Sequence, residues 1–339
     1  MDKLSVAVIG CGYFGSMHAE IYATEPGVRL AVVADLERTR ANALAGRLGC
    51  EGTDDWEAAL SRADVDVVDV CVPDSLHTGV VLAALAQKKH VLIEKPLADT
   101  LENAKILLDA CEGYPYKTMV GHICRFDIRY ERAYEAIRDG TLGEIIYISS
   151  KRNSPTLGAK RYARQCKLIT HSGVHDIDLV RWLTGREFEN VYAASRAVRM
   201  CNEGFPGALD SIQAVFKLQG GITYSLENTW ALPDKYPSYI DASMQIVGTR
   251  SAITMDFGDQ GYRVCSNEGC EYQDVSYWTE SFGVRKGDLR LELVHFLDCV
   301  RYDRTPRCSV RDGYEVAYAA IKVLESAERG EVVPVRGEG

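Results

Sequence analysis

A glycine-rich turn near the N-terminus constrains this chain more than any other feature of its sequence. A short apolar run, 4–9, leads directly into Gly10, Gly12 and Gly15, which are spaced as G-x-G-x-x-G. Gly10 permits a tight turn, Gly12 lets the backbone approach a ligand, and Gly15 lets a following helix pack closely on the strand. The start of that helix offers free N–H groups and the positive end of its dipole to phosphates. The alternative is an ordinary glycine-rich turn, because the motif alone is weak evidence.

An acidic residue follows the second apolar strand, 28–34, where a dinucleotide site needs one. Asp35 lies twenty residues beyond the glycine motif, and its carboxylate can accept hydrogen bonds from both ribose hydroxyls of an adenosine. Its charge would repel a 2′-phosphate, so the sequence predicts NAD rather than NADP as the cofactor. We expect Tyr13, Phe14 and the nearby Arg40 to line the same site.

Composition narrows the class of protein. The chain has 339 residues, of which 46% are hydrophobic, enough for two domains with ordinary cores. Its net charge of −9 argues against nucleic acid or an anionic membrane as a partner. No apolar run approaches the ~20 residues that span a bilayer, and the first strand begins too early for a signal peptide. We therefore expect a cytoplasmic protein. Its eleven cysteines include no C-x-x-C pair, which argues against a zinc cluster or a disulfide framework.

Strands and helices alternate up to about residue 122, which predicts a doubly wound parallel sheet of the Rossmann type over 1–122. The predicted strands are 4–9, 28–34, 67–72, 90–94 and 117–120. The predicted helices are 14–24, 37–48, 55–61, 77–87 and 100–112.

The pattern changes after residue 122. Apolar and polar residues alternate in 222–226, which indicates an open, mostly antiparallel sheet in an α+β domain over 123–339. The predicted strands are 144–151, 188–200, 209–218, 221–230, 242–248 and 251–257. The predicted helices are 127–138, 172–184, 288–302 and 311–328.

Two further groups lie at predicted strand ends, where open α/β sheets bind ligands. Val72, Pro73 and His77 could border the ribose or nicotinamide, although His77 is equally well read as an early residue of the next helix. Glu94 and Lys95, followed by Pro96, end the next strand. A lysine there can hydrogen-bond a substrate hydroxyl and stabilise a developing alkoxide, whereas the alternative is a surface salt bridge between Glu94 and Lys95.

His171, His175 and Asp178 recur at i, i+4 and i+7 around the start of a predicted helix and so share one face. Two histidines four apart can bind zinc, but Ser172 stands where a metalloprotease has its glutamate. We therefore expect no metal. A histidine beside a hydride-transfer site more often moves a proton.

A basic stretch precedes this helix. No acidic residue lies between Glu144 and Asp176, whereas the interval holds Lys151, Arg152, Lys160, Arg161, Arg164 and Lys167. Such a stretch would attract an anionic substrate, with Arg152 and Arg161 as binding residues. The alternatives are a solvated loop and an arm that pairs with an acidic neighbouring subunit.

These motifs, in this order, resemble those of the Gfo/Idh/MocA oxidoreductases, which include glucose–fructose oxidoreductase and inositol dehydrogenase. The matching segments are 10–15, 94–96, 120–122 with 125–126, and 173–178. The resemblance implies a Rossmann domain, a second domain whose open sheet often builds dimers or tetramers, and reversible oxidation of a secondary hydroxyl on a sugar or cyclitol.

The resemblance also implies roles for single residues. It places Lys95 in the active site and His175 at the acid/base position, and it makes His122 and Arg125 candidate substrate contacts. Many members carry an aspartate where this chain has His171, so we expect a substrate-facing, hydrogen-bonding role for His171.

The sequence thus predicts an NAD-dependent dehydrogenase of a sugar-like substrate, and the basic stretch favours an anionic one such as a nucleotide sugar, sugar phosphate or uronate. One alternative is an inositol-type dehydrogenase that acts on a neutral cyclitol. Another is a non-redox enzyme that retains NAD while it eliminates a glycosidic group. A third is a catalytically silent NAD sensor.

Overall fold

The computed structural model describes residues 3–267 and 269–335. The chain divides into two compact units. The first comprises Met1–Phe126 with Ser276–Glu315, and the second comprises Asp127–Val275 with Val316–Gly339. The first unit therefore includes a segment that lies far along the chain, beyond the boundary that the sequence suggested at residue 122. No helix in the described part of the chain is long and apolar enough to cross a bilayer.

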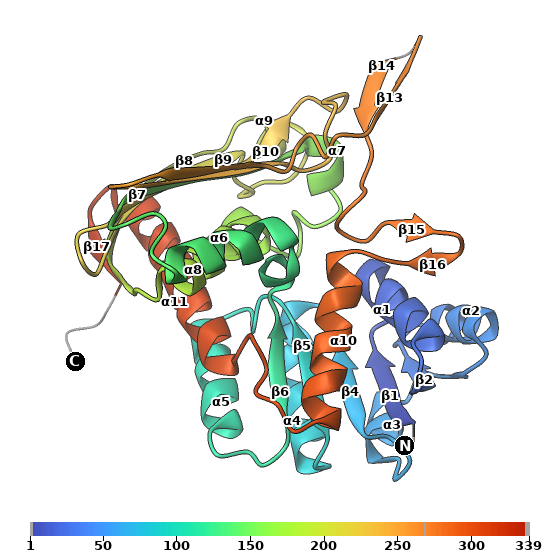
Figure 1. Ribbon diagram of the computed structural model, residues 1–339. Helices are drawn as coiled ribbons and strands as arrows, with labels where there is room; N and C mark the ends of the chain where they lie inside the picture. The colour runs from blue at the N-terminus through green and yellow to red at the C-terminus, as the bar shows by residue number, and fades with distance from the viewer. Residues whose placement is uncertain (1–2, 268, 336–339) are drawn as a thin grey trace. The chain divides into compact units, whose positions relative to one another are not determined.

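A six-stranded parallel sheet forms the centre of the first unit, in the order β3-β2-β1-β4-β5-β6 (Figure 1). Its strands are β1 (Leu4–Ile9), β2 (Val28–Ala34), β3 (Glu51–Thr53), β4 (Val67–Val70), β5 (His90–Glu94) and β6 (Thr118–Gly121). Its connecting helices are α1 (Tyr13–Thr24), α2 (Arg38–Leu48), α3 (Trp56–Ser61), α4 (Asp74–Ala86) and α5 (Leu101–Cys111). This strand order confirms the expected Rossmann fold, whose order reverses between β1 and β4.

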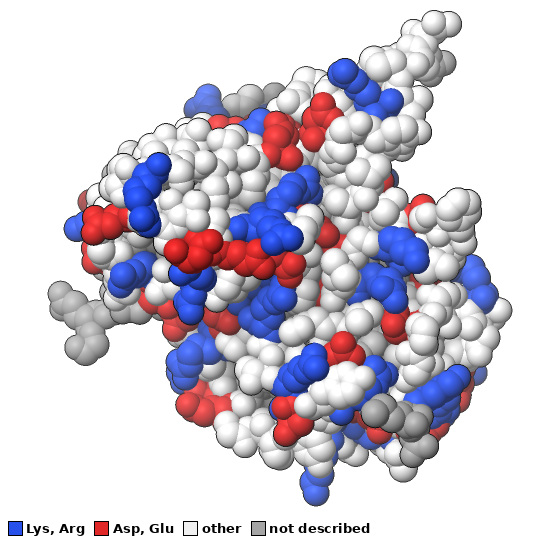
Figure 2. All heavy atoms as spheres, viewed as in Figure 1, with Lys and Arg blue, Asp and Glu red and all other residues white. Residues whose placement is uncertain are grey.

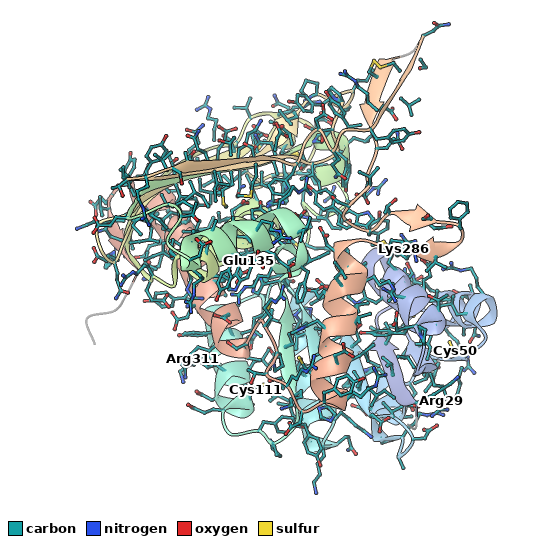
Figure 3. The ribbon with its side chains drawn as sticks, viewed as in Figure 1. Arg29, Cys50, Cys111, Glu135, Lys286 and Arg311 are labelled. Carbon is teal, nitrogen blue, oxygen red and sulfur yellow. A yellow bond between two sulfur atoms is a disulfide. The ribbon has the colours of Figure 1, made fainter. Side chains whose placement is uncertain are left out.

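Continuous apolar sequence explains this sheet. Val6, Val8 and Val68 are fully buried because helices cover both faces of the strands. The cysteines of this unit are scattered, and Figure 3 shows Cys50, in the loop after α2, well apart from Cys111 at the end of α5. Asp69 interrupts the apolar pattern of β4 and is also fully buried.

The C-terminal segment of the first unit begins with β15 (Glu280–Ser281) and β16 (Val284–Arg285) and continues into α10 (Asp288–Arg301). Leu289, Leu293 and Phe296 are buried on one face of α10, which packs against α1 and against the short helix η1 (Ile123–Phe126). The sequence predicted this helix but placed it in the second domain.

The second unit is built on a seven-stranded mixed sheet, ordered β12-β11-β7-β10-β9-β8-β17. Its strands are β7 (Ile145–Pro155), β8 (Phe188–Arg196), β9 (Ser211–Leu218), β10 (Thr223–Leu232), β11 (Asp241–Gly248), β12 (Ala252–Asp256) and β17 (Val333–Pro334). Strands β7 and β10 pair in parallel, and the other pairs are antiparallel. The helices of this part of the chain are α6 (Ile128–Arg138), α7 (Thr156–Ala159), η2 (Ile169–Gly173), α8 (Val174–Thr184), α9 (Arg199–Asn202) and α11 (Val310–Arg329), which crosses the unit boundary.

The two faces of this sheet differ. Along β9, Ile212, Ala214 and Phe216 are buried, whereas Gln213 and Val215 between them are exposed. Helices α6 and α8 lie on one side of the sheet in Figure 1. The period-two alternation that the sequence predicted is therefore confirmed.

A small hairpin of β13 (Arg263–Ser266) and β14 (Gly269–Tyr272) extends from the second unit. Cys265 and Cys270 face each other across it and form a disulfide. This disulfide was not predicted, because the five-residue separation of the two cysteines matches no C-x-x-C motif. The other cysteines in the described chain are free.

Candidate functional site

The three glycines of the first turn lie where their predicted roles require them. Gly10 has a positive φ of 100°, and a Cβ there would lie 2.6 Å from the carbonyl oxygen of Cys71. A Cβ on Gly15 would overlap the carbonyl oxygen of Gly10. Gly12 forms the N-cap of α1, and a Cβ there would meet no described atom within 4 Å. The turn is thus closely packed at its two ends and open at the position that approaches a phosphate.

Asp35 is fixed directly beside this turn. Its Oδ2 accepts a hydrogen bond from the backbone N–H of Cys11 at 2.9 Å, and its Oδ1 accepts one from that of Glu37 at 2.9 Å. The guanidinium of Arg40 contacts Oδ2 at 3.3 Å and also pairs with Glu37 at 2.6 Å. The carboxylate therefore lies between the glycine turn and α2, as binding of an adenosine ribose requires.

The aromatic pair of the glycine motif begins α1. Tyr13 is exposed, and Phe14 packs edge-on against Trp278 with ring centroids 5.6 Å apart. Val72 and Pro73 follow β4 on the other side of the sheet's reversal point and remain accessible. This edge of the sheet fits an NAD molecule. The residues that would hold it are those of the open glycine turn, the anchored Asp35, and the accessible Val72 and Pro73.

His77 lies deeper than the other residues of this edge. Only 1% of it is exposed, and its Nε2 lies 2.9 Å from the carbonyl oxygen of Val72 while its Nδ1 lies 3.3 Å from that of Leu97. Burial lowers its pKa, although these carbonyl contacts oppose the change. The position supports the second interpretation of His77, as an early residue of α4 that ties two loops together.

Glu94 and Lys95 end β5 at the same edge. Glu94 is buried, Lys95 is partly exposed, and Pro96 follows through a cis peptide bond. The Glu94 carboxylate accepts a hydrogen bond from the backbone N–H of Lys95 at 3.1 Å. The glutamate therefore bonds to the main chain of the lysine.

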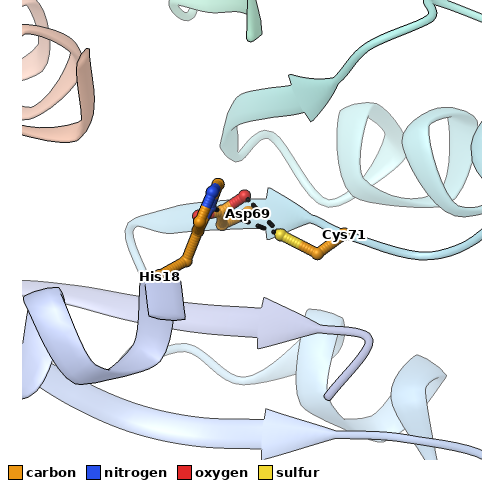
Figure 4. Close-up of side chains that lie close together, drawn as sticks. All are labelled: His18, Asp69 and Cys71. Carbon is orange, nitrogen blue, oxygen red and sulfur yellow. Dashed lines mark hydrogen bonds and ion pairs between the residues drawn. The ribbon is translucent and has the colours of Figure 1, made fainter. Parts of the chain in front are cut away.

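A buried polar cluster next to Glu94 was not predicted from the sequence. His18 Nδ1 lies 2.8 Å from Asp69 Oδ2 (Figure 4). The Tyr22 hydroxyl donates a hydrogen bond to the same oxygen at 2.8 Å. Cys71 Sγ contacts Asp69 Oδ1 at 3.3 Å. An aspartate inside the apolar run of β4 was the available signal, because a carboxylate in a strand buried on both faces requires partners.

The same cluster has the residue types of a metal site. The ligand atoms of His18, Asp69 and Cys71 lie within 4.8 Å of one another. The 2.8 Å separation of His18 Nδ1 and Asp69 Oδ2 is, however, a normal hydrogen-bond length. We therefore interpret the cluster as a hydrogen-bonded network.

Two other candidate substrate contacts are buried in the first unit. His122, which follows β6, is 2% exposed. Arg125 is also 2% exposed, and its Nη1 donates to the carbonyl oxygen of Arg307 at 2.8 Å and contacts Asp312 at 3.4 Å. These contacts give Arg125 partners that join η1 to the start of α11.

In the second unit, the paired histidines begin a helix whose first turn is unusual. Residues Ile169–Gly173 form a π-helical turn before α8, whereas the sequence predicted an α-helix that begins at residue 172. Gly173 allows this turn to approach β10, because a Cβ there would collide with the Asn228 side chain. His171 and His175 are partly exposed, whereas Asp178 is fully buried. Asp178 therefore does not share the accessible surface of the two histidines.

The His171 ring is held by aromatic neighbours. It stacks on Tyr162 with ring centroids 4.5 Å apart and meets Trp230 edge-on at 5.7 Å. Aromatic packing of this kind restricts the rotation of the imidazole. His175 follows one turn later, close to the N-terminus of α8.

The basic stretch differs from its expected role. Arg152 is 8% exposed, and its Nε and Nη2 reach the two oxygens of buried Asp176 at 2.7 and 3.2 Å. Burial raises the pKa of Asp176, and the Arg152 charge opposes this rise. The expectation that Arg152 binds an anionic substrate does not fit this geometry, because removal of either partner would leave a charge buried alone.

Other basic residues of the stretch also have acidic partners. Lys151 pairs with Asp241 at 2.8 Å, and Lys160 pairs with Glu203. Basic and acidic side chains are interspersed over the face drawn in Figure 2. Three of the six basic side chains in the stretch, those of Lys151, Arg152 and Lys160, therefore have acidic partners from other elements. The other three, Arg161, Arg164 and Lys167, are exposed.

Comparison with known proteins agrees with this architecture. Residues 4–122 match a family described as an oxidoreductase family with an NAD-binding Rossmann fold, and residues 134–335 match the C-terminal alpha/beta domain of the same family. The crystal structure of scyllo-inositol dehydrogenase from Lactobacillus casei, with bound NAD(H) and scyllo-inositol, superposes with a TM-score of 0.85. It shares 21% sequence identity, and the match covers 98% of this chain and 99% of that one.

Two relatives illustrate the range of named activities. Inositol 2-dehydrogenase of Rubrobacter xylanophilus is 30% identical over 258 residues, which cover 74% of this chain and 71% of the relative. The 2,7-anhydro-N-acetylneuraminate hydratase of Mediterraneibacter gnavus is 27% identical over 266 residues, which cover 77% and 69%. Together with both domain matches, these findings show that the chain belongs to the Gfo/Idh/MocA oxidoreductase family and is an NAD-dependent oxidoreductase acting on CH–OH groups.

Proposed function

We propose that this protein oxidises a secondary hydroxyl of a neutral cyclitol of the inositol type and that NAD accepts the hydride. The pairing of Arg152 with buried Asp176 carries the choice of a neutral substrate, because this arginine was one of the two residues, with Arg161, that were expected to bind an anion. Similarity to inositol 2-dehydrogenase supports the same choice. The earlier preference for an anionic substrate is therefore replaced by the neutral alternative.

Two residues carry the proton and charge chemistry in this proposal. Lys95, at the end of β5, donates a hydrogen bond to the reacting oxygen and stabilises negative charge on it as the hydroxyl ionises. His175, near the start of α8, accepts the hydroxyl proton and returns it in the reverse direction. The cofactor supplies the hydride acceptor.

Rates on matched substrates test the neutral-cyclitol proposal. We expect kcat/KM with NAD to be higher for myo-inositol or scyllo-inositol than for glucose 6-phosphate or glucuronate. We also expect KM for the cyclitol to change little between 20 and 300 mM salt, because screening does not act on a neutral ligand. A clear preference for the phosphate or the uronate, lost at high salt, would contradict the proposal.

One relative favours a second candidate. A hydratase of an anhydro sugar acid aligns over most of the chain, so a non-redox reaction on a carboxylate-bearing sugar is the alternative. Its signature would be product formation from 2,7-anhydro-N-acetylneuraminate without net NADH. The same substrate panel, extended to that compound, separates the two candidates.

We further propose that the outward face of the second unit's sheet joins copies of the chain. A hollow of about 630 Å³ lies on this face, lined by residues from strands β7 to β12. Val215 and Tyr192 on it are 48% and 46% exposed, which leaves apolar surface available for a partner. Sedimentation equilibrium should give a dimer or tetramer, and Val215→Glu should lower the oligomeric state. A purely monomeric wild-type protein at micromolar concentration would refute this.

A further inference from the structure

The buried cluster beside β5 continues as far as the main chain of Lys95. His18 Nδ1 bonds to Asp69 on one side, and His18 Nε2 lies 3.4 Å from Glu94 Oε1 on the other. The second oxygen of Glu94 accepts the backbone N–H of Lys95. The contact between His18 and Glu94 is an ion-pair distance rather than a hydrogen bond. Together with the two hydrogen bonds it links α1 and β4 to the residue that ends β5.

Burial makes these contacts mutually dependent. The side chains of His18 and Asp69 are completely buried, and that of Glu94 is 11% exposed. Burial alone would lower the pKa of His18, but the Asp69 and Glu94 charges and the hydrogen bond to Asp69 outweigh it and raise the pKa. Burial raises the pKa of Glu94, and the charges of His18 and Lys95 oppose that rise. The imidazole therefore lies between two carboxyl groups, one of which is completely buried.

Glu94 is also confined from the opposite direction. A Cβ on Gly121 would lie 3.0 Å from Glu94 Oε1, so the carboxylate fills the space that the glycine leaves in β6. His18 and Gly121 thus bound the same oxygen. The Glu94 carboxyl group has little freedom to move away from its bond to Lys95.

We propose that His18 is a positioning residue, which fixes the Glu94 carboxylate and through it the main chain at Lys95. The proposal rests on the catalytic role that we assign to Lys95. It assigns a function to a helix residue whose side chain is completely buried. Small displacements of a group that acts on the reacting atoms cost catalysis more than binding.

The chain offers a matched control for this proposal. The Tyr22 hydroxyl donates to the same oxygen of Asp69 that His18 contacts. Within residues 3–267 and 269–335, Tyr22 forms no hydrogen bond with Glu94. His18→Asn and Tyr22→Phe each remove one polar contact to Asp69, and both should lower the melting temperature. Only His18→Asn should lower kcat, by about 10²-fold, with the Kd for NADH from fluorescence titration unchanged.

A double-mutant cycle gives a readout that a purely structural role would not move. If His18 acts through Glu94, the losses in kcat from His18→Asn and Glu94→Gln should not add, because the second substitution disrupts a contact that is already lost. If His18→Asn does not fold, His18→Gln replaces it in both experiments, since the glutamine retains a hydrogen-bond donor.

Three outcomes would overturn the inference: wild-type kcat in His18→Asn, equal losses of kcat in His18→Asn and Tyr22→Phe, or strictly additive losses in the cycle. Lys95→Met separates these outcomes from failure of the proposed function. If Lys95→Met retains wild-type kcat, the assigned role of Lys95 itself is wrong. If Lys95→Met is inactive and His18→Asn is not impaired, only the positioning role of His18 is wrong.

Discussion

Replacing Lys95 with methionine should reduce kcat by about 10²–10³-fold or more, with folding and NADH affinity largely preserved. Methionine keeps the length and much of the apolar volume of the lysine stem but cannot donate a hydrogen bond or carry charge. The lost interaction acts on negative charge that develops in the transition state, so its removal affects kcat more than cofactor binding. Steady-state kinetics on inositol, NADH fluorescence titration and thermal melting measure the three quantities.

A surface lysine provides the control for this substitution. Lys105 lies on α5 and forms an i, i+4 pair with Asp109, and its side chain is 54% exposed. Lys105→Met removes the same charge from the same unit and should leave kcat unchanged. Wild-type kcat in Lys95→Met would show that Lys95 is not catalytic.

Replacing His175 with asparagine should lower kcat by about 10²–10⁴-fold, the usual contribution of a positioned proton carrier. Asparagine retains polarity but does not exchange a proton near neutral pH. The matched substitution His171→Asn should preserve much of the rate and raise KM, because we assign His171 a hydrogen bond to substrate rather than proton transfer.

The aromatic contacts of His171 add a second expectation for that pair of variants. His171→Asn removes a ring stacked on Tyr162 at 4.5 Å, so it should also lower the melting temperature below that of the wild type. Parallel kinetics and melting of both variants provide the comparison. An essential His171 with a dispensable His175 would show that the proton-transfer role was assigned to the wrong histidine.

The sequence predicts the first sheet well because its signals are local. Most of its strands are short, mainly apolar runs, and the turn glycines and Asp35 have positions that few other folds require. The short strand β3 was not predicted, since its three residues, Glu51–Thr53, are exposed or half-buried and lack an apolar pattern. Its pairing with β2 depends on the neighbouring strand rather than on its own residues.

Contacts between segments that lie far apart in the chain could not be predicted from the sequence. The amphipathic pattern of α10 correctly indicates a helix, but an apolar face does not specify which core will cover it. In the structure that face packs against α1, more than 260 residues earlier in the chain. The parallel pairing of β7 with β10 has the same origin, because alternation within a strand does not encode the direction of its neighbour.

In the candidate site, too, local features were predicted and long-range partners were not. The residues of the glycine turn and of β5 could be named from spacing alone, whereas the partners of single charges could not. Arg152 looked available in a stretch without acids, yet it bonds to Asp176, which lies just beyond the end of that stretch. His18 was overlooked because a histidine in a short apolar helix gives no sign of the carboxylates that meet it from β4 and β5.

Transfer of a labelled hydride tests the central claim most directly. The enzyme is incubated with NAD and with inositol that carries deuterium on every ring carbon. The reduced cofactor and the ketone product are then analysed by mass spectrometry. We predict NADH that contains one deuterium, formed in a 1:1 ratio with the inosose ketone. Absence of label from the reduced cofactor, or turnover of a substrate without any net ketone and NADH, would contradict the assignment of this protein as a cyclitol dehydrogenase.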